Sequence, residues 1–193
     1  DRKNPAATLN SFIRASEDKD FKENSCLIIK LSGKMGRRKV ISEINEAQEK
    51  NKFNLILIDQ HLSDEEMAGL RNVTDVFISL HRSEGFGLNL IENMSAGNLV
   101  IATNYSGNTD FMNHENSLLV DYKMISLKEN QYPEWEGQFW ADPSIEDASK
   151  KLLWSFRNNK DRKKLSMNAK KYIEDNFSIR EISKKVSSNI EAI

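Results

Sequence analysis

The chain has 193 residues, which suffices for a substantial core and is typical of one domain or two small ones. Its 28 basic and 29 acidic side chains nearly cancel, and a formal net charge of −1 excludes the strongly basic balance of a nucleic-acid-binding domain. No apolar run approaches the about 20 residues that span a bilayer. The start, DRKNP, has neither an initiator Met nor the apolar core of a signal peptide, so we expect a cut inside a longer chain.

The single cysteine, Cys26, excludes an internal disulfide. It lies in the apolar run CLII, so we predict a core residue rather than a nucleophile. A lone thiol of this kind fits a reducing cytoplasm.

Short apolar runs alternate with longer amphipathic stretches over the first 120 residues. Helical spacing after Pro5 indicates a first helical turn at residues 9–13, and Ser63 followed by Glu66 matches a capping box. Gly97 is a typical helix stop. We predict strands at 25–31, 55–58, 76–80, 99–102 and 117–120, and helices at 39–50, 63–71 and 88–96. This alternation predicts an α/β fold, a Rossmann-like parallel sheet flanked by helices.

The last third of the sequence has a different character. Residues 132–143 contain three aromatic rings of Trp and Phe and two prolines without periodicity, so we predict an ordered, aromatic-rich loop there. Three helices are predicted after it, at 144–158, 161–176 and 178–193. The sequence shows no internal repeat.

The segment with the clearest chemical signal follows the strand predicted at 76–80. Residues 81–88 (HRSEGFGL) form a glycine-containing turn that leads into a helix. In open α/β sheets the ligand crevice borders the carboxyl ends of the strands. Gly85 and Gly87 let the backbone approach a ligand, and the free amides at the helix start suit a phosphate.

Two acidic residues lie eight positions apart in this segment, Glu84 in the turn and Glu92 inside the helix. Helical side chains lean towards the N-terminus, so we expect both carboxylates to face one ligand at the helix mouth. A carboxylate beside a diphosphate is repelled unless hydroxyl donors occupy its oxygens. This favours a ligand with phosphate and polyol parts. Periodicity alone leaves open that Glu92 lies on an exposed face and that Glu84 caps a helix.

The spacing Glu84-x7-Glu92 within SEGFGL resembles the E-x7-E signature of retaining GT-B glycosyltransferases, above all family 4. Further segments resemble, in the same order, the bacterial subgroup that builds lipopolysaccharide and other surface glycans: RKNP (2–5), HRSEGFGL (81–88), ATNYSGNTDFM (102–112), ENSLLV (115–120) and WADP (140–143). The resemblance covers nearly the whole chain. It implies that residues 1–193 form the nucleotide-sugar-binding, C-terminal domain of such an enzyme, without the N-terminal acceptor domain.

The resemblance also implies roles for individual residues. Glu84 would bind hydroxyls of the donor sugar as the catalytic-site acid, Glu92 the ribose hydroxyls, and Lys3 the diphosphate. Lys3 as a solvated terminal lysine remains an alternative. The further donor-binding candidates are backbone amides of the turn, two residues near the base and two flanking residues whose roles are open: Gly85, Phe86, Gly87, Leu88, Gln60, Leu62, His81 and Arg82.

The sequence departs from the family pattern at three places. The usual Gly-Arg before the phosphate-binding lysine has no counterpart, so the phosphate-binding arginine stays unassigned. Asn93 stands where alanine is common, and Asn98 where proline is common. We interpret both asparagines as packing changes away from the ligand.

Glycosyl transfer develops negative charge on the leaving diphosphate, which amides, a helix N-terminus and cations can stabilise. The chain has no Asp-x-Asp pair after an apolar strand, so we predict no metal and no cofactor besides the donor substrate. The resemblance implies retention of configuration. It also implies a glycan or glycolipid acceptor bound by the missing domain, and a cytoplasmic enzyme that leaves room for peripheral contact with the inner face of the membrane. We expect the isolated chain to bind donor without transferring sugar.

Three other classes compete with a transferase. A non-enzymatic nucleotide-sugar-binding module remains open. A Rossmann dehydrogenase is disfavoured because no Gly-x-Gly-x-x-Gly follows the first strand. A two-domain sugar-phosphate isomerase is disfavoured by the segment WADP at 140–143.

Overall fold

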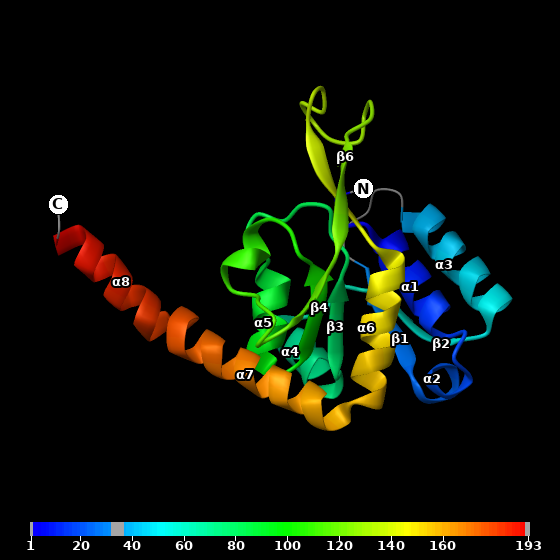
Figure 1. The fold of residues 1–193 in the computed structure, drawn as a ribbon, viewed down its shortest axis with the longest axis horizontal. Coiled ribbons are helices and arrows are strands. Elements are labelled where there is room, and N and C mark those ends of the chain that lie inside the picture. The colour runs from blue at the N-terminus through cyan, green and yellow to red at the C-terminus, as the bar shows by residue number, and fades with distance from the viewer. Residues whose placement is uncertain (1, 32–36, 192–193) are drawn as a thin grey trace.

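The computed structural model describes residues 2–31 and 37–191. Figure 1 shows a body of strands and helices from which a β-ribbon projects on one side and a helical arm on another. The parallel strands are β1 (Cys26–Lys30), β2 (Asn54–Ile58), β3 (Val76–Ser79), β4 (Leu99–Thr103) and β5 (Leu118–Val120). Among them lie the helices α1 (Pro5–Ala15), α2 (Lys19–Asn24), α3 (Arg37–Asn51), α4 (Asp64–Val73) and α5 (Leu88–Ala96).

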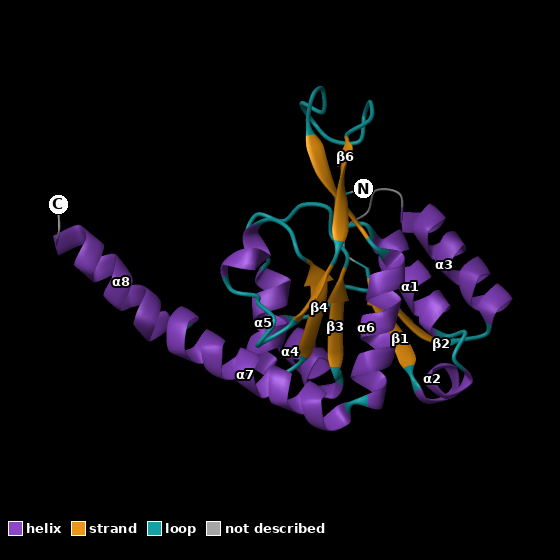
Figure 2. Ribbon diagram, viewed as in Figure 1, coloured by secondary structure: helices purple, strands orange, loops and turns teal. Residues whose placement is uncertain are grey.

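The parallel strands form two ladders, flanked by helices as Figure 2 shows. β1 pairs with β2 in parallel, and β4 lies between β3 and β5, parallel to both. The predicted Rossmann-like α/β class is confirmed, and all five predicted strands are present within one or two residues of their expected bounds. β4 reads as five consecutive buried residues, which suits a central strand covered on both faces.

The helix signals in the sequence also have the expected physical form. Ser63 and Glu66 make the reciprocal bonds of a capping box at the start of α4. α5 ends at Gly97, which takes the left-handed conformation with φ 92°. The helical turn predicted at residues 9–13 is too short, because α1 spans 11 residues there, and α2 was not predicted.

The prediction of an irregular loop over residues 132–143 was wrong in its second half. Phe139–Pro143 form β7, which pairs antiparallel with β6 (Tyr122–Ser126) to make the projecting ribbon in Figure 1. Trp140 and Ala141 are buried while Phe139 is exposed. Aromatic residues and a terminal proline in this run conceal a strand because its long connection to β6 leaves no short hairpin turn in the sequence.

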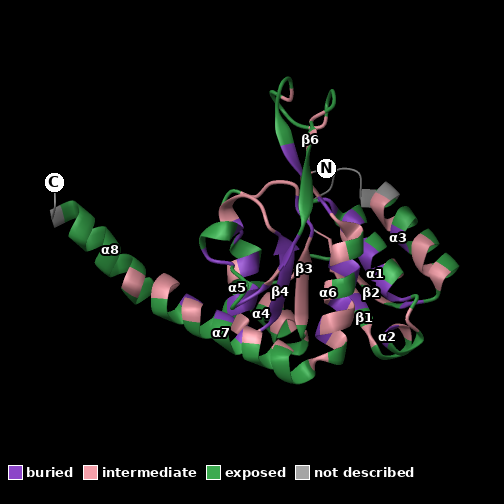
Figure 3. Cartoon of the chain, in the orientation of Figure 1, coloured by how far each residue is buried: buried purple, intermediate pink, exposed green. Residues whose placement is uncertain are grey.

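Two clusters of buried apolar side chains hold the layers together. One joins α1, β1, α3, β3 and α6 (Ile145–Arg157), and the other joins α5 and β4 to α7 (Asn159–Phe177). Figure 3 shows the buried residues gathered along β4 and the helix faces next to it. The second cluster positions the start of α5, because Leu90 and Met94 anchor that helix beneath its exposed face.

The chain continues from α7 into α8 (Ile179–Glu191), which projects from the body as an arm in Figure 1. Four of its apolar side chains are exposed: Ile179, Ile182, Val186 and Ile190. Among the described residues, no helix has the length and apolar character needed to cross a bilayer.

Cys26 corrects one prediction, because it is exposed at the first position of β1 rather than buried in the core. Its neighbour Leu27 is the buried residue of the strand. The alternation of a strand places these two side chains on opposite faces, which the apolar run CLII does not reveal.

Candidate functional site

The loop between β3 and α5 ends in a helix start that has no side-chain cap. Gly87, the N-cap of α5, has φ 98°, and the first turn contains no acidic residue. A Cβ on Gly87 would lie 2.8 Å from Cδ1 of Leu90, so both backbone conformation and space require glycine there. The amides at the very start of α5 therefore remain available to an anion, with the positive end of the helix dipole behind them.

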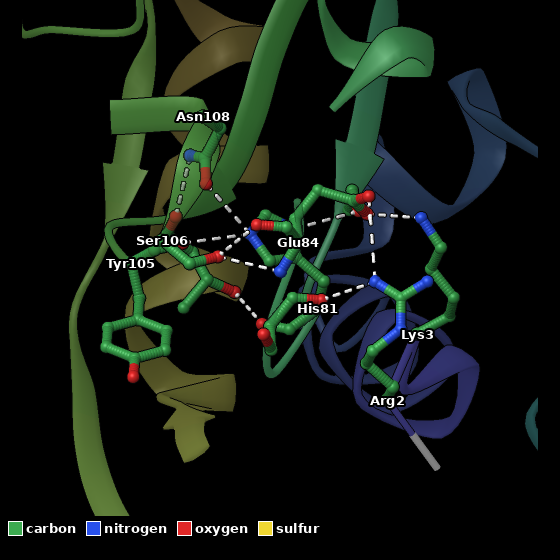
Figure 4. Close-up of polar contacts among 10 residues, drawn as sticks. Arg2, Lys3, His81, Glu84, Tyr105, Ser106 and Asn108 are labelled. Atoms are coloured by element: carbon green, nitrogen blue, oxygen red, sulfur yellow. Dashed lines mark hydrogen bonds and ion pairs between the residues drawn. The ribbon is translucent and has the colours of Figure 1, made fainter. Parts of the chain in front are cut away.

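Glu84 lies in this loop against two cations from the N-terminal segment, as Figure 4 shows. Its carboxylate forms an ion pair with the Lys3 ammonium, and Glu84 Oε1 lies 3.6 Å from Nη1 of Arg2. Burial by itself would raise the pKa of Glu84, but the hydrogen bond and charge of Lys3 together with the charge of Arg2 outweigh it and lower the pKa. Glu84 is therefore ionised at neutral pH.

The N-terminal segment is tied to the same loop through its backbone. Nη1 of Arg2 donates to the carbonyl of Ser83 at 2.8 Å, and the amide of Arg82 donates to the carbonyl of Arg2 at 2.8 Å. Two cations from one end of the chain thus lie beside the acidic loop from its middle. The sequence offered no sign of this contact for Arg2.

The loop after β4 forms hydrogen bonds to the backbone of Glu84. Oγ of Ser106 accepts a hydrogen bond from the Glu84 amide at 2.7 Å and donates one to the Glu84 carbonyl at 2.9 Å. Ser106 has φ 72° and ψ −154°, a conformation that costs a residue with a side chain about 1–3 kcal/mol. Gly107 follows, at the start of the 3-10 turn η1 (Gly107–Asp110), and its amide also donates to the Glu84 carbonyl.

His81 does not lie where a ligand could touch it. Its side chain is fully buried, with Nε2 at 3.2 Å from the Tyr105 carbonyl and 3.0 Å from Oδ1 of Asn108. Burial is the main cause that lowers the pKa of His81, so the ring is neutral at pH 7. Nε2 therefore carries the proton, and Nδ1 accepts from Oγ of Ser79 at 3.2 Å. The expectation that His81 contacts the donor is therefore corrected: His81 is a buried residue with a structural role.

Arg82 is also engaged within the protein. Its guanidinium lies 3.1 Å from Oδ1 of Asp142 and 5.0 Å above the ring of Trp140. Its backbone carbonyl accepts from the Ala141 amide at 3.0 Å. The WADP segment therefore holds the base of the β6–β7 ribbon to the Glu84 loop, and the side chain of Arg82 has this anchoring role in place of the expected donor contact.

Glu92 has different surroundings from Glu84. Its carboxylate forms an ion pair with Arg71 of α4 beside a hollow of about 400 Å³ between α4, α5 and the end of α7. Glu84 is not among the residues that line this hollow. The two carboxylates thus have different partners in this structure, and their facing one ligand stays a prediction.

The remaining candidates lie at the surface around these two acids. Gly85 has open space where a Cβ would stand, and Leu88 is 66% exposed at the start of α5. Phe86 packs with its ring centroid 5.3 Å from that of Phe111, a contact that helps to fix the loop. Gln60 and Leu62 lie in the loop between β2 and α4, the first exposed and the second half-buried.

The family model described as "Glycosyl transferases group 1" matches residues 4–172. The chain belongs to this family. No curated protein matches the sequence. The C-terminal domain of the group 1 glycosyl transferase LpcC from Francisella tularensis matches with a TM-score of 0.73 and 17% identity, over 92% of this chain and 81% of that one. HepE from Anabaena, in complex with UDP and glucose, matches with a TM-score of 0.69 and 12% identity, over all of this chain and 46% of its own.

These similarities confirm the expected C-terminal half of a GT-B glycosyltransferase, and they are compatible with family 4 and the surface-glycan subgroup. A pneumococcal O-GlcNAc transferase, GtfA, in complex with UDP and GlcNAc, matches with a TM-score of 0.69 and 16% identity, over 99% of this chain and 33% of its own. This chain thus spans less than half the length of HepE and GtfA. In residues 2–31 and 37–191, no group of three or more His, Cys, Asp or Glu could hold a metal ion, and metal-independence stays a prediction.

Proposed function

We propose that this chain binds a nucleoside-diphosphate sugar at the start of α5 and supplies the donor half of a retaining, metal-independent glycosyltransferase in surface-glycan synthesis. The observation that carries the proposal is that the loop between β3 and α5 bears Glu84 and leads into an uncapped helix start, while Lys3 and Arg2 of the N-terminal segment lie against Glu84. Amides and cations suit a diphosphate, and an ionised carboxylate suits sugar hydroxyls. HepE, whose structure holds UDP and glucose, shares the fold that creates this arrangement.

Donor binding at this loop is an exchange of partners. In the free protein, Lys3 and Glu84 neutralise each other. A bound diphosphate takes Lys3 and Arg2, while sugar hydroxyls take the oxygens of Glu84, so no charge is left unpaired. Arg2 thereby provides the arginine that the family pattern places before the phosphate-binding lysine.

Transfer itself needs stabilisation of the leaving diphosphate. Charge that develops on its oxygens would meet the first-turn amides of α5, held in place before the reaction, and the two N-terminal cations. We assign the ribose hydroxyls to Glu92, which reaches them after it leaves Arg71. Because the Arg71–Glu92 pair is partly exposed, separating the two side chains costs little free energy.

Calorimetric titration of the chain with UDP, UDP-glucose and other nucleoside-diphosphate sugars tests the binding proposal. We expect one base to be preferred, and Lys3→Met to weaken that ligand by about tenfold or more, the effect of one charge-assisted bond. Lys150→Met is the matched control, since Lys150 forms an ion pair with Glu146 on α6, outside the Glu84 loop. Equal weakening by both variants, or no binding at all, would contradict the proposal.

Glu92→Ala tests the ribose assignment within the same titration. We expect it to weaken UDP and the other nucleotides alike, because they share the ribose, and to leave inorganic diphosphate binding unchanged. Unchanged nucleotide affinity would remove Glu92 from the site.

Turnover separately tests whether the protein is a transferase or a binding module: we propose that the chain alone binds donor without transferring sugar. Measurable transfer by the chain alone would contradict this, and a full protein that binds donor yet transfers nothing would be a binding module.

A further inference from the structure

Ser106 and Gly107 fasten the two peptide groups on either side of the Glu84 Cα. Three hydrogen bonds, of 2.7, 2.9 and 3.0 Å, join these two residues to the amide and carbonyl of Glu84. We propose that Ser106 is a positioning residue that orients the Glu84 carboxylate towards the donor sugar. This inference rests on the proposed function of Glu84 and adds a residue to it.

Ser106 has an unfavourable backbone conformation, and the hydrogen bonds of its hydroxyl offset the cost of that conformation. At φ 72° and ψ −154°, glycine would be the natural occupant. A glycine, however, has no oxygen to bridge both polar groups of Glu84. A serine in this conformation is explained by the two bonds that its Oγ makes, one as acceptor and one as donor.

Gly107 allows the two loops to come close enough for these bonds. A Cβ on Gly107 would lie 1.8 Å from the carbonyl oxygen of Gly85 and 3.0 Å from Cα of Phe86. The backbones of the two loops are therefore in direct contact. This contact uses up the Glu84 peptide groups while the amides at the start of α5 stay free for a ligand.

A buried polar network anchors the Ser106 turn to the sheet (Figure 4). Asn108 is fully buried, and its Nδ2 donates to the carbonyl of Thr103 at the end of β4 at 3.0 Å. Its Oδ1 accepts from His81, and Oγ1 of Thr103 donates to the His81 carbonyl at 2.7 Å. The ends of β3 and β4 thus hold the turn rigidly, and the turn holds Glu84.

The orientation follows from these constraints. With its amide and carbonyl both bound, Glu84 can direct its side chain only to one side of the loop, where Lys3 and Arg2 lie. Without the Ser106 hydroxyl, the Glu84 amide loses its acceptor and the Glu84 carbonyl keeps only the Gly107 amide, so the carboxylate can move away from the cations. Ser106 then affects the sugar end of the ligand and leaves the nucleotide end alone.

The first test needs no ligand and uses Ser106→Gly in the whole 193-residue chain. Glycine suits the backbone at this position, so the variant removes the hydroxyl without new strain. By nuclear magnetic resonance, we expect the Glu84 amide to exchange its hydrogen about fivefold faster or more, the effect of one lost hydrogen bond. We also expect the Glu84 carboxyl pKa to rise towards its ordinary value. A variant that lacks either change overturns the proposal.

Ser117→Ala is the control, because Ser117 is buried, whereas Ser106 is half-buried, and its Oγ likewise bonds to backbone, donating to the Asn113 carbonyl at 2.7 Å. It should lower stability without changing the exchange rate or pKa of Glu84. If it changes both as Ser106→Gly does, the effect is general loosening and the positioning role is overturned.

The second test separates sugar from nucleotide by titration with UDP and with UDP-glucose. In the wild-type chain, we expect UDP-glucose to bind more tightly than UDP. Ser106→Gly should lose this difference and keep the affinity for UDP, and retention of the full difference overturns the proposal. A wild-type chain that binds no nucleotide of any kind contradicts the proposed function instead, while exchange and pKa still decide whether Ser106 positions Glu84.

Discussion

The two acids of the E-x7-E pair lie in contrasting regions of the molecule. Glu84 belongs to a loop whose backbone is bound on both sides, and its side chain is 13% exposed beside two cations. Glu92 lies on the outer face of a regular helix, with a side chain that is 45% exposed and one partner, Arg71. The two acids belong to one sequence motif, but Glu84 is held firmly and Glu92 is not.

This difference indicates how the two acids can act. A carboxylate in a fixed loop is oriented before a ligand arrives, so little further ordering is needed when it binds. A carboxylate on an exposed helix face adapts by a change of rotamer after the ligand arrives. The following substitutions should therefore have their largest effect in the loops that hold Glu84 and their smallest at the Glu92 side chain.

The largest effect is expected from Gly107→Ala, because the new methyl group would overlap the carbonyl of Gly85. We expect the loop contact to break and the free energy of unfolding to fall by about 3 kcal/mol or more, measured by urea denaturation. Gly85→Ala is the control in the facing loop, since its Cβ meets nothing within 4 Å. Similar losses for both variants would mean that the overlap is not the cause.

The next largest effect is expected where α4 is held beside α5, below Arg71. Nδ2 of Asn98 donates to the Arg71 carbonyl, to Oγ1 of Thr74 and to Oδ1 of Asn93. Asn98→Ala leaves these three acceptors, one in a buried bond and two in part-buried bonds, without their donor and should cost about 1–3 kcal/mol of unfolding free energy.

A double-mutant cycle with Asn93→Ala sharpens this prediction. Asn93 and Asn98 are two of the three departures from the family pattern, and their side chains bond to each other at 3.0 Å. We expect a coupling free energy of about 0.5–1 kcal/mol. Strict additivity would show that the two asparagines arose independently of this contact.

A smaller effect, which depends on pH, is expected from Lys3→Met. The folded-state pKa of Glu84 is lowered, so its ionised form contributes stability above its unfolded pKa, and this is lost as the pH falls through the folded value. Without Lys3, the Glu84 pKa rises and less stability is lost between neutral pH and about pH 3. Denaturation at several pH values measures this pH dependence of the unfolding free energy, with Lys150→Met as control. Parallel plots of unfolding free energy against pH for wild type and Lys3→Met would contradict the prediction.

The smallest effect is expected from Glu92→Gln, which keeps the shape of the side chain and removes its charge. Its pair with Arg71 is partly exposed, so the unfolding free energy should fall by about 0.5 kcal/mol or less. A loss as large as that of Asn98→Ala would show that Glu92 is as firmly held as Glu84, and the contrast between the two regions would fail.

Local signals made most of the fold predictable. Period and length identified all five parallel strands, and α5 has the bounds that its apolar spacing and Gly97 indicated. The β6–β7 ribbon was not expected, because pairing across a long connection leaves little trace in either strand. Exposed Cys26 was misjudged for a related reason: which face of an edge strand is covered depends on distant helices.

The sequence by itself determined the family, the glycine-bearing turn, and the presence of Glu84 and Glu92 around one helix start, since these depend on neighbours in the chain. Only the tertiary structure decided their partners. Lys3 lies 81 positions from Glu84, and Arg71 lies 21 from Glu92. Ser106 reaches Glu84 over 22 positions, because β3 and β4 end side by side. Hydrogen bonds and ion pairs act through space, so a residue's neighbours in the fold, rather than in the chain, set its orientation and charge.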